Sequence, residues 1–241
     1  MPARQRNEVN GVLLVDKPGG WTSYDVVNFV KHNFNVAKIG HCGTLDPLAT
    51  GLLVLILGKA TKLQDRLMSG SKVYEGSLRL GVETDTEDGT GVVTAEHDSA
   101  GVTEGALLEA MASFSGEISQ VPPMVSAIKK NGTPLYELAR KGITIEREAR
   151  KVTIFSWELL QSRLPEADFR VHCSKGTYVR TLCADLGRKL GCGGIMTALR
   201  RTRCGHFSLG NAVGIEQLKS LDLEALRAAV IPPEAAVPPG A

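Results

Sequence analysis

The chain's most informative stretch is a turn that holds a single carboxylate. Asp46 lies in GHCGTLDPLATGLL, residues 40–53, and the apolar run 51–58 overlaps its end. A turn that feeds a buried strand holds a side chain rigidly at the edge of a cleft, where functional groups are commonly placed. The structural alternative is that Asp46 caps the turn ahead of Pro47, as aspartate often does. Local chemistry alone favours the cap, so the interpretation depends on the other candidate residues.

Three further side chains lie at positions that suit chemistry. Tyr74 is in the expected strand SKVYEG, Arg180 follows KGTYV at the start of a helix, and Lys17 is in a Pro-Gly-Gly turn. Each has an ordinary alternative: a half-buried sheet tyrosine, an exposed helix arginine and a solvated turn lysine. Together with Asp46 they form a chemical set, because a guanidinium favours the ionised form of a nearby carboxylate. An aromatic ring beside that pair can stack on a base taken out of its helix.

The charge of the chain is unevenly distributed, although the net charge is only +2. Residues 83–98 carry six acids and no Lys or Arg, whereas residues 175–203 carry seven Lys or Arg and one acid. Residues 129–151 carry seven Lys or Arg and three acids. Two basic segments in one fold predict a surface for a polyanion such as nucleic acid, with solvated faces as the ordinary alternative.

Composition and missing motifs exclude several classes of protein. A chain of 241 residues with 43% hydrophobic and 22% charged residues is typical of a soluble globular protein. No apolar run has the length of a membrane span, and no signal peptide is evident. The five cysteines form no CxxC pair, and His41 beside Cys42 lacks further ligands, so no metal site is expected. No nucleotide or redox motif is present, so we expect no cofactor. The cysteines suggest no disulfide framework, so we expect a cytoplasmic location.

The expected elements do not follow a regular strand–helix alternation, which favours the α+β class over a doubly wound parallel sheet. Strands are expected at 11–16, 51–58, 72–80, 151–161, 168–173 and 198–209. Helices are expected at 22–34, 61–68, 103–114, 135–141 and 178–190, with two weak ones at 216–219 and 223–230.

Three other segments have a distinct character. Residues 84–91 are an acidic loop, and Val73, Leu78 and Leu80 are the core candidates of the strand before it. Residues 121–150 contain prolines and a basic Asn131–Gly132 turn, which indicates an excursion from the main sheet. The Pro-rich end at 232–241 is expected to fray.

Four motifs together closely resemble the TruB family of tRNA pseudouridine synthases. They are VDKPGGWTSYDVV (15–27), GHCGTLDPLATGLL (40–53), KVYEGSLRLGVETDTEDGTG (72–91) and HCSKGTYVRTLCADLG (172–187). The likeness runs from about Gly11 to Leu209 and keeps the family's motif order. It implies the pseudouridine-synthase fold, with a central, largely antiparallel sheet flanked by helices. It also implies one catalytic domain over 1–241 and an RNA-clasping insertion at 121–150.

The resemblance implies isomerisation of uridine-55 in the T-loop of tRNA, without a metal or organic cofactor. Asp46 matches the family's catalytic carboxylate, which attacks the flipped nucleotide or removes a sugar proton, and both routes stay open. Tyr74 matches a tyrosine that stacks on the uracil and assists removal of the carbon-5 proton. Arg180 matches an arginine that pairs with the carboxylate. The remaining implied contacts are Lys17, His41, Asp88, Tyr178 and Leu199 for substrate binding, and Lys129, Lys130 and Lys141 for clasping RNA.

One departure from the family concerns the C-terminal end. Many relatives continue into a small RNA-binding domain of the PUA type, and none is expected after Leu209 here. The departure argues against the guide-RNA-dependent relatives and predicts weaker tRNA affinity. We expect the tRNA T-loop and T-arm as partner, no membrane, no obligatory protein or guide-RNA partner, and a monomer.

Two alternative functions remain open. One alternative to the T-loop enzyme is an enzyme of the same class that acts on another RNA. The other is an RNA-folding or RNA-binding protein whose catalysis is incidental. Catalysis is favoured, because a protein that only binds RNA would not need a carboxylate–guanidinium pair.

Overall fold

The computed structural model describes residues 6–126, 128–130 and 132–237. The chain forms two compact units, Met1–Tyr74 with Leu199–Ala241 and Glu75–Ala198. It passes from one unit to the other within strands β4 (Lys72–Leu80) and β12 (Gly194–Cys204). That the whole chain acts as one catalytic domain stays a prediction.

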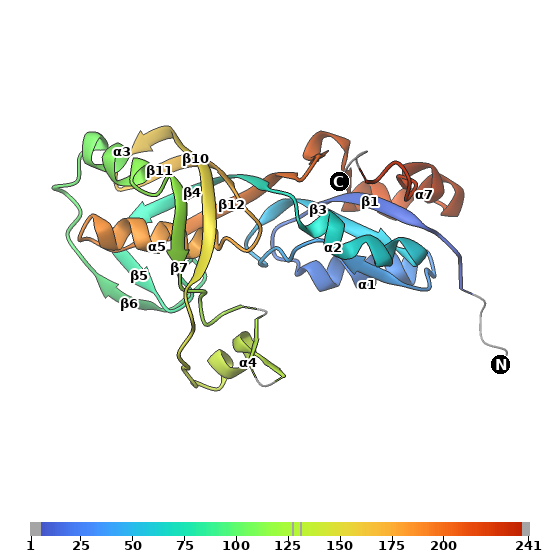
Figure 1. The fold of residues 1–241 in the computed structure, drawn as a ribbon, viewed down its shortest axis with the longest axis horizontal. Helices are drawn as coiled ribbons and strands as arrows, with labels where there is room; N and C mark the ends of the chain where they lie inside the picture. Colours follow the sequence, from blue (N-terminus) through green and yellow to red (C-terminus); the bar gives the residue numbers. More distant parts are fainter. Residues whose placement is uncertain (1–5, 127, 131, 238–241) are drawn as a thin grey trace. The chain divides into compact units, whose positions relative to one another are not determined.

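The first unit is built around β1 and β3 (Figure 1). β1 pairs antiparallel with β3 and parallel with β14, and β3 pairs parallel with β12 and antiparallel with β2. The strand order is β14-β1-β3-β12, and β13 pairs with β12. The elements confined to this unit are β1 (Gly11–Lys17), α1 (Ser23–Asn33), β2 (Ile39–His41), β3 (Thr50–Leu57), η1 (Gly58–Leu63), α2 (Gln64–Met68), β13 (Phe207–Ser208), η2 (Leu209–Asn211), β14 (Val213–Gly214), α6 (Ile215–Ser220) and α7 (Leu223–Ala229).

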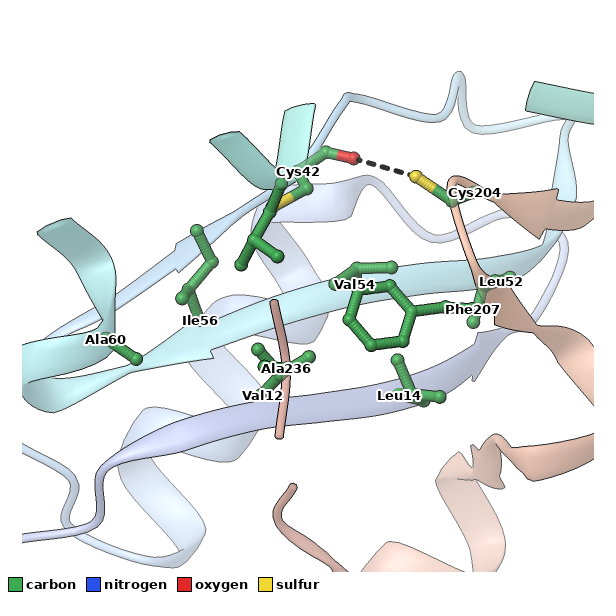
Figure 2. Packing of buried hydrophobic residues seen from close by; sticks show 11 residues of the cluster. Val12, Leu14, Cys42, Leu52, Val54, Ile56, Ala60, Cys204, Phe207 and Ala236 are labelled. Atoms are coloured by element: carbon green, nitrogen blue, oxygen red, sulfur yellow. Dashed lines mark hydrogen bonds between the residues drawn. The ribbon is translucent and has the colours of Figure 1, made fainter. Parts of the chain in front are cut away.

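Continuous apolar runs in β1 and β3 explain why these strands form the core of the unit. Nearly every residue of both strands is buried, as expected for strands that are covered on both faces. Figure 2 shows one face, where alternate side chains of the two strands meet Cys42, Phe207 and Ala236. The strand contribution to this cluster is Val12, Leu14, Leu52, Val54 and Ile56.

Helix α1 begins as its sequence predicts. The Thr22 hydroxyl accepts a hydrogen bond from the Asp25 amide at 3.0 Å, and the Asp25 carboxylate accepts one from the Thr22 amide at 2.8 Å. This reciprocal cap satisfies two amides that a helix leaves without partners. The buried side of the helix carries Ser23, Val26, Val27 and Val30, so Ser23 faces inward at the first helical position.

The second unit contains a sheet in the order β4-β11-β10-β7. β10 pairs antiparallel with β11 and with β7, which confirms the predicted α+β class with largely antiparallel pairing. Trp157 packs edge-to-face against Phe169 and Phe114 in the core of this unit. Its further elements are β5 (Val82–Thr84), β6 (Val93–Glu96), α3 (Glu104–Ala112), β7 (Gly116–Gln120), β8 (Lys129–Lys130), β9 (Thr133–Pro134), α4 (Leu135–Arg140), β10 (Arg150–Arg163), β11 (Glu166–Cys173) and α5 (Val179–Lys189).

The predicted excursion lies between β7 and β10 and contains the β8–β9 hairpin and α4. In Figure 1 its yellow-green segment projects away from the sheet of the second unit. Asn131, half of the predicted Asn-Gly turn, lies outside the described residues. No helix among residues 6–126, 128–130 and 132–237 has the length and apolar character needed to span a membrane.

The Pro-rich end differs from its prediction. Ile231 exchanges two backbone hydrogen bonds of 2.8 Å with Val12, and Ala236 is fully buried in the core of Figure 2. The prediction of a frayed end is therefore wrong as far as Val237, because apolar residues between the prolines pack on β1. Residues 238–241 lie outside the described part of the chain.

Two element predictions also need correction. β12 begins at Gly194, four residues before the predicted start. The prediction was late because the glycines before Ile195 are typical of a loop. On β4, Val73 is only half-buried, whereas its neighbours Lys72 and Tyr74 are buried in phase with Leu78 and Leu80. The period of two therefore holds, but a lysine takes the inward position that a hydrophobicity pattern gives to valine.

Candidate active site

Asp46 lies in the loop between β2 and β3, and its side chain is half-buried. Leu45 and Ala49 are buried, with exposures of 3% and 0%, and anchor the loop on both sides of the carboxylate. The Ala49 amide donates to the Asp46 carbonyl at 3.1 Å, which closes the turn. The structure therefore places Asp46 in a fixed turn that leads directly into a buried strand, as its sequence predicts.

Residues before and at the start of α1 hold this loop by hydrogen bonds to its backbone. The Ser23 hydroxyl donates to the Leu45 carbonyl at 3.1 Å and accepts from the Leu45 amide at 2.8 Å. The Gly20 amide donates to the Pro47 carbonyl at 2.9 Å. The motifs around Lys17–Ser23 and Asp46 are thus parts of one local structure, in which the start of α1 positions the loop.

Lys17 is fully buried, so the alternative of a solvated turn lysine is wrong. Its ammonium donates to the carbonyls of Pro18 at 2.9 Å, Trp21 at 2.6 Å and Pro47 at 3.4 Å. Burial lowers the pKa of Lys17 to about 8, and Arg201 adds to the lowering while Asp46 opposes it. Lys17 therefore ties the turn after β1 to the Asp46 loop, which differs from direct contact with a substrate.

The other predicted residues of the first unit occupy β2, β4 and β12. Tyr74 and Leu199 are almost buried, with exposures of 9% and 8%. His41 is half-buried, and its Nδ1 has no hydrogen-bond partner among the described residues. Burial and the positive charge of Arg201 lower the pKa of His41, so the ring favours its neutral form.

Arg201 is a buried residue of this site that the sequence interpretation missed. Its side chain is 1% exposed, and its guanidinium donates to the carbonyls of Leu52 at 2.7 Å and Gly43 at 3.1 Å. The sequence carries no local signal for this burial, because Arg201 lies between Arg200 and Thr202 and is followed by Arg203 in the same strand. A charge at an inward strand position is rare unless its donors are satisfied.

In the second unit, Arg180 is 3% exposed, so the alternative of an exposed helix arginine is wrong. Its guanidinium donates to the carbonyls of Thr86 at 2.7 Å and Val125 at 2.8 Å. Its Nε lies 3.8 Å from a carboxylate oxygen of Asp88. Arg180 therefore connects α5 to the acidic loop and to the start of the excursion.

Asp88 organises the acidic loop from within. Its carboxylate accepts hydrogen bonds from the Thr86 hydroxyl at 2.8 Å and from the Thr90 amide and hydroxyl at 2.9 and 2.6 Å. Asp88 is 5% exposed. Its main contribution is to fix the loop that faces Arg180.

Glu87 and Gln120 are two further residues that sequence reasoning missed. Glu87 accepts a hydrogen bond of 2.5 Å from the Thr181 hydroxyl, and burial raises its pKa. Gln120 accepts from the Tyr178 amide at 2.8 Å and donates to the Tyr178 carbonyl at 3.1 Å. The two Gln120 bonds hold Tyr178 at the start of α5. The sequence around Glu87 and Gln120 gives no local signal that these residues hold α5.

The three lysines of the predicted RNA clasp are exposed, two on β8 and one at the end of α4. Lys130 also donates to the Glu146 carbonyl at 3.0 Å, which ties the hairpin to the returning chain. The clasp role of Lys129, Lys130 and Lys141 stays a prediction.

Each unit thus holds its own part of the predicted site. In the first, Lys17 and Arg201 each hold carbonyls of the segment around Asp46. In the second, Asp88 lies beside Arg180, and Gln120 holds Tyr178 at the start of α5. Asp46 belongs to the first unit and Arg180 to the second, and their pairing stays a prediction. No group of three or more His, Cys, Asp or Glu residues suits a metal ion within the described ranges.

Comparison with known proteins identifies the family. A model of the TruB family pseudouridylate synthase N-terminal domain matches residues 31–179. A model of the tRNA pseudouridylate synthase B C-terminal domain matches residues 180–238. The tRNA pseudouridine synthase B of Aromatoleum aromaticum is 52% identical over 97% of this chain and 75% of its own length. The tRNA pseudouridine synthase B of Opitutus terrae is 47% identical over 97% of both chains.

Solved structures agree with this assignment. A Cbf5–Nop10–Gar1 complex contains a chain that is 31% identical, with a TM-score of 0.73 over 94% of this chain and 61% of that one. A chain of the archaeal box H/ACA sRNP Nop10–Cbf5 complex is 29% identical, with a TM-score of 0.70 over 95% of this chain and 61% of that one. The resemblance that the four motifs indicate is confirmed: the chain belongs to the TruB family of pseudouridylate synthases and is an isomerase.

Proposed function

We propose that this enzyme converts uridine-55 in the T-loop of tRNA to pseudouridine, with Asp46 as the catalytic carboxylate. The observation that carries the proposal is the Asp46 loop, whose carbonyls are held by the buried Lys17 and Ser23 side chains. Rigid placement suits a carboxylate that must meet one sugar carbon or proton, because positioning lowers the barrier of such a step. Relatives that are named tRNA pseudouridine synthase B support the choice of substrate.

The reaction moves the uracil from one bond to another without loss of atoms from the nucleoside. The bond between C1′ and N1 breaks after Asp46 attacks the flipped nucleotide, at its sugar or its base, or after Asp46 removes a sugar proton. The uracil then turns and joins C1′ through C5, C5 loses its proton, and N1 gains one. Tyr74 stacks on the uracil and assists the proton removal, while Arg180 keeps the carboxylate ionised.

The remaining candidate residues receive supporting roles in this proposal. Tyr178 and Leu199 line the uridine pocket, and His41 supports the extruded loop. An unpaired loop nucleotide flips at lower cost than a paired one, which suits a T-loop substrate. The exposed lysines of the excursion contact phosphates of the flanking RNA.

Tritium release tests the proposal directly. A tRNA transcript labelled with tritium at uridine C5 should lose label to water with the wild-type enzyme, because C5 exchanges its proton for the new bond. Asp46→Asn should keep the fold, since the substitution is nearly isosteric, and should release no label. Equal release by wild type and Asp46→Asn would exclude Asp46 as the catalytic group, and no release by either would exclude the activity on this tRNA.

A second candidate is an RNA substrate other than the T-loop. The similarity to chains of H/ACA complexes supports this candidate, since one such structure is an H/ACA RNP bound to a substrate RNA. Pseudouridine mapping of total RNA from cells with and without the gene separates the two. If position 55 of tRNA is the one site that loses pseudouridine without the gene, the T-loop is the substrate. Loss at sites in other RNAs supports the second candidate.

The third candidate is an RNA-folding role in which catalysis is incidental. The exposed basic clasp favours keeping it. In that case, Asp46→Asn would complement a deletion strain as well as wild type does. Replacement of Lys129, Lys130 and Lys141 by alanine would abolish complementation.

A further inference from the structure

Arg201 and Lys17 are charged side chains that lie buried beside the Asp46 loop, with exposures of 1% and 0%. Burial of a guanidinium is costly unless its donors are satisfied. Here Nε donates to the Leu52 carbonyl at 2.7 Å and one terminal nitrogen donates to the Gly43 carbonyl at 3.1 Å. The two acceptors lie on opposite sides of Asp46 in the sequence, three residues before it and six residues after it.

We propose that Arg201 is a positioning residue that sets the Asp46 carboxylate by clamping both ends of its loop. A guanidinium is planar and rigid, so donors on one group fix the separation of the two carbonyls that they reach. The loop between Gly43 and Leu52 is thereby closed at its base, and Ser23 and Lys17 hold its middle. The inference rests on the proposed role of Asp46.

The first and last glycines of GTLDPLATG fit the same role. Gly43 has φ of +92°, and a Cβ there would lie 3.4 Å from a terminal nitrogen of Arg201. Gly51 has φ of +95°, and a Cβ there would lie 2.4 Å from the Arg201 carbonyl oxygen. Gly51 is also the register partner of Arg201 between β3 and β12. Gly51 therefore approaches the Arg201 backbone more closely than another residue would allow, whereas Gly43 is favoured by its positive φ.

Arg201→Lys tests the clamp, because lysine keeps the charge but loses the planar fork that reaches both carbonyls. We expect amide exchange at Leu45 and Ala49 to rise about tenfold under native conditions. We expect the single-turnover rate on tRNA to fall about 10- to 100-fold, because small displacements of a catalytic group have effects of this size. The Kd for tRNA should stay within about twofold, because Arg201 is buried and cannot contact RNA.

Leu226→Ala provides a control matched for loss of stability. Leu226 is fully buried in α7 of the same unit, so its truncation lowers the melting temperature through a cavity. It should leave the amide exchange at Leu45 and Ala49 and the rate per folded molecule unchanged. Equal changes in Leu226→Ala and Arg201→Lys would reduce Arg201 to a general structural role and overturn the proposal.

Wild-type exchange and rate in Arg201→Lys would overturn it as well. If Arg201→Lys does not fold, Gly43→Ala replaces it, since alanine is strained at a φ of +92° and shifts the carbonyl that Arg201 holds. Unchanged exchange and rate in Gly43→Ala then count against the clamp. Should the wild type itself be inactive on the tRNA, the proposed function fails, and the exchange data still decide the clamp.

Discussion

Lys17 shows how strongly a single side chain depends on the carbonyls around it. Its ammonium has no exposed surface and donates to three backbone carbonyls, one of which belongs to the Asp46 loop. Burial lowers its pKa from 10.5 to about 8, so the folded chain holds this proton less tightly than the unfolded chain does. The charge therefore costs stability at neutral pH and is retained for its position beside the loop.

This proton linkage predicts a pH dependence of stability. Between about pH 8 and pH 10.5 the unfolded chain binds more protons at Lys17, so stability rises with pH in that window. The free energy of unfolding of wild type should rise relative to that of Lys17→Met by up to about 3 kcal/mol. Urea unfolding of both proteins across this range measures the difference, and a constant difference would mean that Lys17 titrates normally.

The residue scale is also where sequence interpretation was weakest. The motifs that contain Asp46, Tyr74 and Arg180, together with the motif at 15–27, were sufficient to indicate a family. The burial of Lys17 and Arg201 was not predictable. The carbonyls that satisfy Arg201 belong to Gly43 and Leu52, which are distant in sequence, and Lys17 adds the distant Pro47 to the nearby Pro18 and Trp21. A hydrophobicity pattern assigns such cations to the surface, and only the folded backbone shows otherwise.

At the scale of elements, α1 positions the loop as well as packing on the core. Thr22 caps the helix, and the next residue, Ser23, exchanges two hydrogen bonds with the backbone of Leu45. The Thr22 hydroxyl therefore stabilises the helix, whereas the Ser23 hydroxyl positions the loop.

Ser23→Ala and Thr22→Ala form a matched pair of variants. Ser23→Ala leaves the buried Leu45 amide without its acceptor and should cost about 1–3 kcal/mol. Thr22→Ala removes the cap and should cost about 1 kcal/mol. Only Ser23→Ala should also lower the turnover rate, by about tenfold, since only this change frees the loop. Thermal unfolding and tritium release measure both effects, and equal rates in the two variants would contradict the positioning role of α1.

Gly51 at the entry to β3 gives a second prediction at this scale. Gly51→Ala forces a Cβ to within 2.4 Å of the Arg201 backbone at a positive φ and should cost about 2 kcal/mol or more. Gly20→Ala is the control, because Gly20 has φ of +81° but open space around the added Cβ. Denaturant unfolding should show the larger loss for Gly51→Ala. A similar loss in both variants would mean that backbone conformation, and not the close approach, accounts for the glycine.

Helices and long strands were predictable, and strands of two or three residues were not. α1, β4, α3 and the β10–β11 pair match their expected segments closely, because caps and periodic apolar residues mark them over many residues. β2, β8, β9, β13 and β14 contain two or three residues each, which is too few for a periodic signal. The order of strands was not predicted, since pairing between distant segments leaves no local pattern.

At the scale of the whole molecule, charge separates RNA binding from catalysis. The exposed lysines of the excursion are distinct from the buried groups around Asp46 and Arg180. In the proposed function, the first set provides electrostatic attraction to phosphates and the second set provides the chemistry.

Salt dependence tests this separation. Binding of tRNA should weaken steeply with ionic strength, and replacement of Lys129, Lys130 and Lys141 by alanine should reduce the log–log slope by about two. Asp46→Asn should bind tRNA as wild type does. Filter binding at several salt concentrations measures the slopes. A flat profile for wild type, or an unchanged slope in the triple variant, would contradict the clasp.

The most direct test of the central claim is a structure of the enzyme with a T-loop hairpin that carries 5-fluorouridine at position 55. Fluorine replaces the hydrogen that must leave C5 as a proton, so the reaction cannot be completed and the complex should be captured during or after attack. We predict a flipped-out base, with the Asp46 carboxylate at its sugar or ring, Tyr74 stacked on it and Arg180 paired with Asp46. A base that stays stacked in the RNA loop, or an Asp46 carboxylate directed away from the nucleotide, would contradict the account.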